Sequence, residues 1–249
     1  MSASIGQEFI EKTKPKYAGP SRQSQGLPQP PLELGYPSDG ILIRLPAHDQ
    51  APTPEMDLRR AMEVRKTIRQ YSPQPLSLEE LSYLLWVTQG VRRITTRPST
   101  ARNVPSAGAR HAFETYVLIN RVDGLEPGLY RYIATQHALL LADGSLDINV
   151  RLTEACAHQE HVGNSAVTFF WVAVLERMYW RYGERGYRYL FLDAGHVCQN
   201  LYLAAEAIDS GVCAIGAYDD DALNAALGVD GENQFTVYAA TLGKRAPRE

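Results

Sequence analysis

Hydrophobic residues recur at helical spacing in three parts of the chain. Apolar side chains at positions 58, 61, 62 and 68 form a partial face, which predicts a helix that begins at Thr53 or Asp57 and ends near Gln70. Leucines at positions 78, 81, 84 and 85 form a second stripe. Residues 187–211 have the strongest helical period, and they predict an apolar central helix.

Capping signals mark the ends of two helices. Ser77 followed by Glu80 is the pattern of a capping box, and Gly90 is a suitable stop for the helix that this box begins. Residues 219–228 combine a run of aspartates with a final glycine, which predicts a short capped helix. A further short helix is expected within residues 148–161.

Several segments are rich in β-branched and aromatic residues and predict strands. The run at 166–178 is almost continuously apolar, as in a strand that is buried on both faces. Helices and strands do not alternate steadily, so the pattern favours an α+β fold. The other expected strands are an edge strand within 40–46, a strand at 113–120, a hairpin of 129–133 with 138–142, and a last strand at 235–243.

Proline divides the chain into two parts. Residues 1–54 contain nine of the fifteen prolines, and proline fixes φ and removes a backbone donor. We therefore expect residues 1–54 to form an extended, irregular arm, and residues 55–249 to form the folded domain. The apolar residues at 41–43 indicate that the arm packs on the domain.

Overall composition excludes several classes of protein. The net charge of −3 gives no basic footprint for nucleic acid, and no run of about 18 apolar residues could span a membrane. The N-terminal segment lacks the apolar core of a signal peptide, and the three cysteines form no CxxC pair. We therefore expect a cytoplasmic protein with neither a nucleic-acid nor a membrane partner.

A local group of cations stands out against this near-neutral background. Arg65, Lys66, Thr67 and Arg69 lie close together, and in the expected helix Arg65 and Arg69 share one face. Guanidinium groups fit a phosphate bidentately. Cations in a last helical turn also complement the helix dipole without any ligand. The residues alone leave these two interpretations evenly balanced.

Two glycine-containing segments are weaker candidates. Residues 105–111 are small enough for backbone to approach a flat ligand, and Arg110 could reach a polar edge of it. Residues 210–223 contain Gly211 and Gly216, around which backbone N–H groups could donate to a ring. The simpler alternatives are a plain loop before a strand for the first segment, and for the second a left-handed cap at Gly211 with a tight turn at Gly216.

Other chemistry finds little support. Cys156, His158 and His161 do not match a zinc spacing, so we expect surface polar residues there and no metal site. His196 lies within the apolar helix, where a histidine is more often structural than catalytic. The chain contains neither a GxSxG motif nor a P-loop, which argues against hydrolases and kinases.

Taken together and in this order, the motifs RKTIRxY, PSAGARH and GVCAIGAYD resemble those of the nitroreductase superfamily of FMN-dependent oxidoreductases. Within that superfamily the chain is similar to the SagB/ThcOx dehydrogenase group. The resemblance covers most of the chain. It implies a nitroreductase-like α+β fold, with a central mixed, mostly antiparallel sheet flanked by helices, and a homodimer with FMN at its interface.

The resemblance also implies roles for particular residues. Arg65, Lys66, Thr67 and Arg69 would hold the FMN phosphate and approach the N1/O2 side of the ring. The loop residues Pro105, Ser106 and Arg110 would lie near the isoalloxazine, in part from the partner subunit. The backbone at Gly216 and Ala217 would face flavin N5, and Lys244 with Arg245 would add a second phosphate contact.

The implied reaction is a ping-pong hydride transfer. NAD(P)H or another donor would reduce FMN, and a small acceptor such as a nitroaromatic or a quinone would then be reduced. Tyr182 is the first candidate for a protein acid. Two alternatives stay open: oxidation of a peptide azoline, or flavin binding without catalysis. Azoline dehydrogenases are associated with a Lys-Tyr pair that Arg181-Tyr182 would match here, and arginine is a poor general base.

Overall fold

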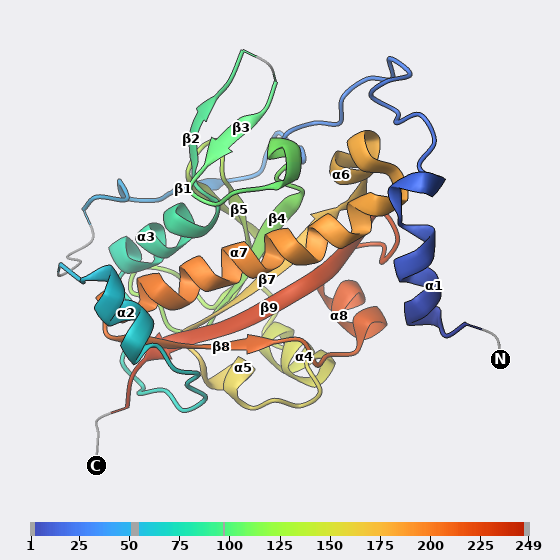
Figure 1. Ribbon diagram of the computed structural model, residues 1–249. Coiled ribbons are helices and arrows are strands. Elements are labelled where there is room, and N and C mark those ends of the chain that lie inside the picture. Colours follow the sequence, from blue (N-terminus) through green and yellow to red (C-terminus); the bar gives the residue numbers. More distant parts are fainter. Residues whose placement is uncertain (1–2, 51–54, 97, 247–249) are drawn as a thin grey trace.

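The structure is a computed structural model that describes residues 3–50, 55–96 and 98–246 (Figure 1). Its centre is a seven-stranded sheet with the order β1-β6-β5-β4-β7-β9-β8, in which all neighbouring named strands are antiparallel. An isolated bridge between Thr67 and Val212 adds a parallel pairing. The strands are β1 (Leu42–Arg44), β4 (Phe113–Ile119), β5 (Gly128–Ile133), β6 (Ala138–Asp143), β7 (Val167–Val174), β8 (Ser210–Ile215) and β9 (Gln234–Lys244).

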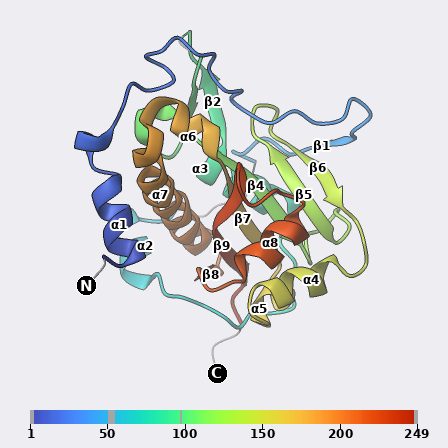
Figure 2. The same ribbon diagram turned by 90° about the vertical axis from the view of Figure 1, so that its right-hand side faces the viewer.

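Helices cover both faces of this sheet (Figure 1 and Figure 2). The long helix α7 and helix α3 lie on one face, whereas α4, α5 and α8 lie on the other. The α-helices are α1 (Ile5–Lys12), α2 (Leu58–Val64), α3 (Leu78–Gln89), α4 (Ile148–Ala155), α5 (His161–Asn164), α6 (Leu175–Tyr182), α7 (Gly186–Ala207) and α8 (Asp220–Leu227). Three short 3₁₀ helices are η1 (Pro15–Tyr17), η2 (Ala107–Ala109) and η3 (Gly183–Arg185).

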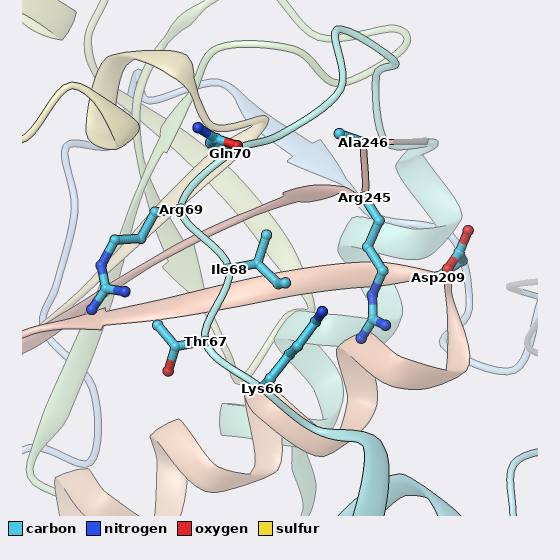
Figure 3. Close-up of a pocket in the computed structure, with 8 residues that line it drawn as sticks. All are labelled: Lys66, Thr67, Ile68, Arg69, Gln70, Asp209, Arg245 and Ala246. Atoms are coloured by element: carbon cyan, nitrogen blue, oxygen red, sulfur yellow. The ribbon is translucent and has the colours of Figure 1, made fainter. Parts of the chain in front are cut away.

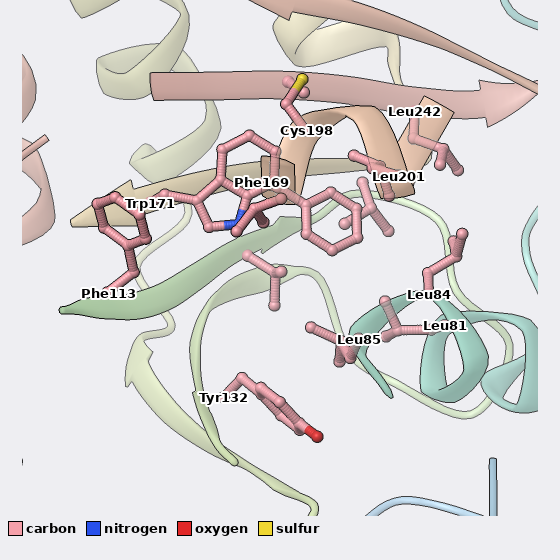
Figure 4. Close-up of a cluster of buried hydrophobic side chains, with 14 of the residues drawn as sticks. Leu81, Leu84, Leu85, Phe113, Tyr132, Phe169, Trp171, Cys198, Leu201 and Leu242 are labelled. Carbon is pink, nitrogen blue, oxygen red and sulfur yellow. The ribbon is translucent and has the colours of Figure 1, made fainter. Parts of the chain in front are cut away.

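The central strand β7 supplies both hydrophobic cores. Because side chains alternate along a strand, Phe169 and Trp171 enter the core under α3 and α7, which Figure 4 shows. Phe170 and Val172 enter the second core, under α4 and α8. The apolar run at 166–178 is thus buried on both faces as expected, but its strand ends at Val174 and its last residues begin α6.

Several predicted elements are confirmed. The capping box of Ser77 and Glu80 begins α3, and Asp219 caps α8, which ends at Gly228 in the left-handed conformation. The hairpin β5–β6, the edge strand β1 and the last strand β9 lie where the pattern predicted them. Gly90 does end α3, but its backbone is extended, and a Cβ there would lie 2.4 Å from the Trp86 ring.

Three predictions about boundaries are wrong. The helix expected up to Gln70 ends at Val64; its alternative start at Thr53 lies outside the described residues, and Asp57 is its N-cap. The central helix ends at Ala207, and the rest of the predicted segment enters β8, the edge strand. The polar, small-residue segment 91–111, for which no strand was predicted, contains a ribbon of β2 (Val91–Ile94) and β3 (Thr100–Arg102).

The N-terminal arm passes over the top of the molecule in Figure 1 and is bonded to the domain. The indole N–H of Trp180 donates to Leu27 O at 2.9 Å, and Arg177 Nε donates to Pro31 O at 2.8 Å. The arm also contains α1, which its capping box at Ser4 begins and which the hydrophobic pattern did not predict. The expected boundary at residue 54 lies outside the described residues.

Candidate functional site

The cation segment leaves α2 and crosses the edge of the sheet as extended chain. The Ile68 N–H donates to Val212 O at 2.9 Å, and the Ser72 N–H donates to Lys244 O at 3.0 Å. These bonds to β8 and β9 replace helical ones after Val64. The expectation that Arg65 and Arg69 share one helix face is therefore wrong.

Two glycines allow this crossing. Gly211 of β8 and Gly243 of β9 are paired in register. A Cβ at Gly211 would lie 2.5 Å from Ile68 Cγ1, and one at Gly243 would lie 2.8 Å from Tyr71 Cγ. Close approach of the crossing segment explains Gly211, so the alternative of a left-handed cap there is wrong: the positive φ of 48° belongs to Asp209.

The crossing segment and the end of β9 enclose an open cavity of about 660 Å³ (Figure 3). Three of the residues that line it are cations, Lys66, Arg69 and Arg245, and Asp209 is the one acid among them. Thr67 adds a hydroxyl group. The structure thus brings together four of the predicted phosphate residues. The remaining lining residues are Ile68, Gln70 and Ala246.

Arg245 is held in place by the protein. One terminal amino group pairs with the Glu206 carboxylate at 2.5 Å, and its Nε donates to Ser210 O at 3.1 Å. Within the described part of the chain its Nη1 has no such partner and can donate to a ligand. A guanidinium fixed in this way gives an incoming anion a preformed donor.

Two predicted phosphate residues do not line this cavity. Arg65, at the C-cap of α2, lies over the Tyr202 ring, 5.2 Å from its centroid. Lys244 points inward, where Nζ pairs with Glu80 at 2.5 Å and donates to Ile208 O at 2.8 Å. Neighbouring residues of a strand point to opposite sides, so only one of Lys244 and Arg245 can face the cavity.

Tyr202 of α7 was missed by the sequence analysis and organises this region. Its hydroxyl accepts the Ala214 N–H at 3.0 Å and lies 3.2 Å from Thr67 Oγ1. Its ring also supports Arg65. The one signal for it in the sequence is a polar-tipped aromatic residue within an otherwise apolar helical stripe.

The loop that contains Pro105, Ser106 and Arg110 packs against α6 and α7. The Ala107 N–H donates to Asp193 Oδ1 at 3.2 Å, and the His111 N–H donates to Ser106 Oγ at 2.9 Å. Burial raises the pKa of the Asp193 carboxyl above its ordinary value, against the opposing effect of hydrogen bonds from Ser106 and Ala107. Asp193 was also missed, because an acid in an apolar helix carries no distinctive pattern.

The backbone of this loop is unusual. Gly108, Ala109 and His111 all have positive φ, at 58°, 52° and 43°. A side chain at Gly108 would meet Tyr182, because a Cβ there would lie 2.4 Å from the Tyr182 hydroxyl. The guanidinium of Arg110 lies 5.3 Å from the centroid of the Trp180 ring. Tyr182 therefore borders the loop.

Gly216 and Ala217 follow β8 and are exposed. The Ala217 carbonyl accepts a hydrogen bond from Gln159 Nε2 at 2.7 Å, which ties this turn to the segment between α4 and α5. A Cβ added at Gly216 would have no atom within 4 Å, so the space beside this residue is open.

In one chain the loop and the cation cavity lie far apart. Asp193, which holds the loop, and Ala207, the last residue of α7, are separated by about 21 Å of helix, at about 1.5 Å per residue. The cavity residue Asp209 lies beyond that end. One FMN could contact both parts if the loop came from a second chain.

The other candidates stay separate from this cavity. Among the described residues no group of three or more His, Cys, Asp or Glu side chains could hold a metal. Cys156 is fully buried, so the prediction that it is a surface residue is wrong. Burial raises the pKa of its thiol to about 12. In the described ranges no helix has the length and apolar character needed to cross a membrane.

Comparison with known proteins identifies the family of the chain. Residues 62–244 match the model of the nitroreductase family. MJ1384 of Methanocaldococcus jannaschii, which is named as a nitroreductase, is 33% identical over 173 residues, or 70% of this chain and 85% of that protein. A crystal structure from Ralstonia eutropha, also named as a nitroreductase, has a TM-score of 0.69 and 25% identity, over 89% of this chain and 100% of that one.

A second relative is the trifolitoxin-processing protein TfxB of Rhizobium leguminosarum bv. trifolii. It is 33% identical over 147 residues, which is 55% of this chain. The matched part is 39% of TfxB, so this chain spans a minor part of that relative. The likeness to TfxB supports the SagB-type group that the motifs indicated. The chain belongs to the nitroreductase family, and it has that family's fold.

Proposed function

We propose that this chain is an FMN-dependent oxidoreductase that works as a homodimer. NAD(P)H or another donor would supply a hydride, and a small acceptor such as a nitroaromatic or a quinone would take it. The observation that carries the proposal is that Lys66, Arg69 and Arg245 line one open cavity beside a single carboxylate. Family membership supports the oxidoreductase class.

The donor set of the cavity fits a phosphate group. Lys66 offers an ammonium group, Arg245 a fixed guanidinium and Thr67 a hydroxyl. Charge-assisted hydrogen bonds of this kind are about twice as strong as neutral ones. These residues would hold the phosphate end of FMN, and Arg69, at the same cavity, would place positive charge toward the N1/O2 side of the ring.

The ring end of the cofactor would be completed by a second copy of the chain. Helix α7 exposes Phe191 and Leu192, at 56% and 60%, next to exposed Gly195. A contiguous patch of exposed apolar side chains is typical of a surface that contacts another protein. A partner docked on α7 would bring its Pro105, Ser106 and Arg110 to the ring, while the amide at Gly216 or Ala217 would face N5.

When bound, FMN would supply the hydride chemistry itself. The residues of this chain would bind the cofactor, exclude water and direct hydrogen-bond donors to the positions where charge develops. Tyr182, beside the 105–111 loop, is the proposed proton donor if the acceptor needs one from the protein.

Titration with FMN tests the phosphate site. Lys66→Gln and Arg245→Gln should each weaken FMN binding by about tenfold, the equivalent of one lost charge-assisted contact of about 1.4 kcal/mol. Arg59→Gln is the matched control, because Arg59 is an exposed cation of α2 that pairs with Glu63 and does not line the cavity. If Lys66→Gln and Arg245→Gln bound FMN as tightly as the Arg59→Gln control, the phosphate would not be held in this cavity.

A second candidate function is the oxidation of a peptide azoline. The likeness to TfxB favours it. The pair Arg181-Tyr182 argues against it, because arginine stays protonated near neutral pH and is a poor general base. Turnover of an azoline peptide by the flavin-loaded protein, measured by the loss of two mass units from the peptide, would favour this candidate over the first.

A further inference from the structure

A second cavity lies between the N-terminal arm and the end of α6. Its volume is about 520 Å³, within the range of sites for small molecules. The arm lines one side with residues between Lys12 and Gln25, and residues of α6 and η3 from Tyr179 to Arg185 line the other. None of the residues proposed to hold the phosphate lines this cavity.

The cavity combines aromatic rings with an excess of positive charge. Tyr17, Tyr179 and Tyr182 line it, together with five cations and one acid, Glu184. The Glu184 carboxylate already accepts the Tyr179 hydroxyl at 2.9 Å. The five cations are Lys12, Lys14, Arg22, Arg181 and Arg185.

Three of these cations are already committed to the protein. Lys14 pairs with Glu11, and Arg22 pairs with Glu176. Arg185 donates to the Tyr189 hydroxyl at 3.0 Å and to Thr13 O at 3.2 Å. The contacts of Arg22 and Arg185 hold the arm on the domain, and all three cations have little donor capacity left for a ligand.

Arg181 is different. In the part of the chain that the structure describes it has neither an ion pair nor a hydrogen bond, and its guanidinium lies 5.6 Å from the centroid of the Tyr182 ring. It is half-buried, and its side chain approaches Gly108 of the 105–111 loop. A half-buried guanidinium in a cavity gains most from a planar, bidentate anion such as a carboxylate. Lys12, more exposed, is the other cation without such partners among the described residues.

We propose that this cavity binds a small aromatic carboxylic acid. Arg181 would take the carboxylate, and the rings of Tyr17, Tyr179 and Tyr182 would pack on the aromatic part. Because Arg181 and Tyr182 border the 105–111 loop, the bound acid would lie next to the flavin ring. A role of the acid as a substrate of the flavin rests on the proposed function, whereas its binding does not.

Calorimetric titration of the full chain with 3-phenylpropionate tests the binding, with 3-phenylpropionamide as the neutral analogue. The acid should bind at least about tenfold more tightly than the amide, because a lost charge-assisted contact is worth about that factor. Saturating FMN is added so that the first cavity does not compete for the acid. The second cavity is lined without the phosphate residues. The comparison with Arg181→Gln therefore reports binding at the second cavity even if no flavin is taken up, and the two proposals fail separately.

Variants assign the binding to Arg181. Arg181→Gln should remove the preference for the acid, whereas Lys14→Gln, an equal change of charge on the same cavity, should preserve it. Tyr17→Ala should weaken acid and amide alike. Failure of the acid to bind, equal affinity for acid and amide, or an unchanged preference in Arg181→Gln would overturn the proposal. So would binding of an acidic peptide in place of the small acid.

Discussion

Glu114 and Arg177 form a buried ion pair behind the N-terminal arm. Both side chains are 3% exposed, and the carboxylate lies 2.5 Å from the guanidinium. Glu114 also accepts the Leu34 N–H at 2.9 Å. Removal of one partner from such a pair leaves an uncompensated buried charge, which is costly even where the intact pair adds little.

Glu114→Gln should therefore lower the free energy of unfolding by about 3 kcal/mol. Glu63→Gln is the matched control, because Glu63 pairs with Arg59 on the exposed surface of α2, and such pairs contribute at most about 1 kcal/mol. Urea denaturation of both variants measures the difference. Equal unfolding midpoints would show that the buried pair is not retained in solution.

His111 gives the stability a dependence on pH. Burial lowers its pKa to about 3, and the nearby charges of Arg102 and Arg110 act in the same direction. The folded protein therefore keeps His111 neutral, while the unfolded chain takes up a proton below its ordinary pKa of about 6.5. The unfolded state then binds more protons, so stability falls as the pH drops from about 6.5 toward 3.

Between pH 6.5 and pH 5 this loss should be about 2 kcal/mol, at about 1.4 kcal/mol for each pH unit. His111→Gln should remove that part of the slope. Urea unfolding of both proteins over this pH range makes the comparison, and parallel slopes for the two would contradict the assigned pKa.

The sequence located the cations but not their directions. The cavity is lined by Lys66, Arg69 and Arg245, which the sequence motifs had indicated as phosphate residues. Motifs of this kind can be recognised from the order of residues along the chain alone. Arg65 and Lys244 do not line it, because a helix end and a strand register decide where side chains point. Tyr202 and Asp193 act through contacts with segments that are distant in the sequence. The hydrophobic periodicity of a helix does not reveal such contacts.

At the scale of elements, the crossing of β8 and β9 determines the geometry of the cation cavity. Ile68 and Tyr71 fit over Gly211 and Gly243, and the crossing turns the cation segment toward the end of β9. Helical periodicity at 57–70 could not predict this, because the competing hydrogen bonds come from residues about 140 and 170 positions later.

Gly211→Ala should lower stability by about 2 kcal/mol through overpacking against Ile68, and it should weaken FMN binding as the segment shifts. Gly35→Ala is the control, since an added Cβ there meets no atom within 4 Å and its φ is not positive. Thermal unfolding and FMN titration of both variants test this. Wild-type stability and affinity in Gly211→Ala would show that the crossing is looser than described.

Capping residues made other elements predictable. Ser77 with Glu80, and Asp219 with Gly228, mark α3 and α8 through local hydrogen bonds, so sequence alone located both helices. The apolar run at 166–178 was ambiguous, because a doubly buried strand and a buried helix are equally apolar. The structure uses it for both β7 and α6.

At the scale of the whole molecule, the N-terminal arm is part of the fold. It supplies backbone acceptors at Leu27, Pro31 and Gly35 to Trp180, Arg177 and Arg131 of the domain. Each of these donors, if left buried without its acceptor, would lower the free energy of unfolding by about 1–3 kcal/mol.

Deletion of residues 1–50 should therefore lower stability by several kcal/mol, at about 1–3 kcal/mol for each lost partner. Deletion of residues 1–12 is the comparison, because α1 has no buried residue and should cost far less. Urea unfolding midpoints measure both effects. If the two deletions were equally harmless, the arm would be a dispensable tail.

We propose that the cation cavity of one chain and the 105–111 loop of another together hold one FMN. The most direct test is the visible absorption spectrum of the purified protein, with the released cofactor identified by mass and quantified against the chain. We expect about one FMN per chain. A colourless protein that takes up no added FMN would contradict it.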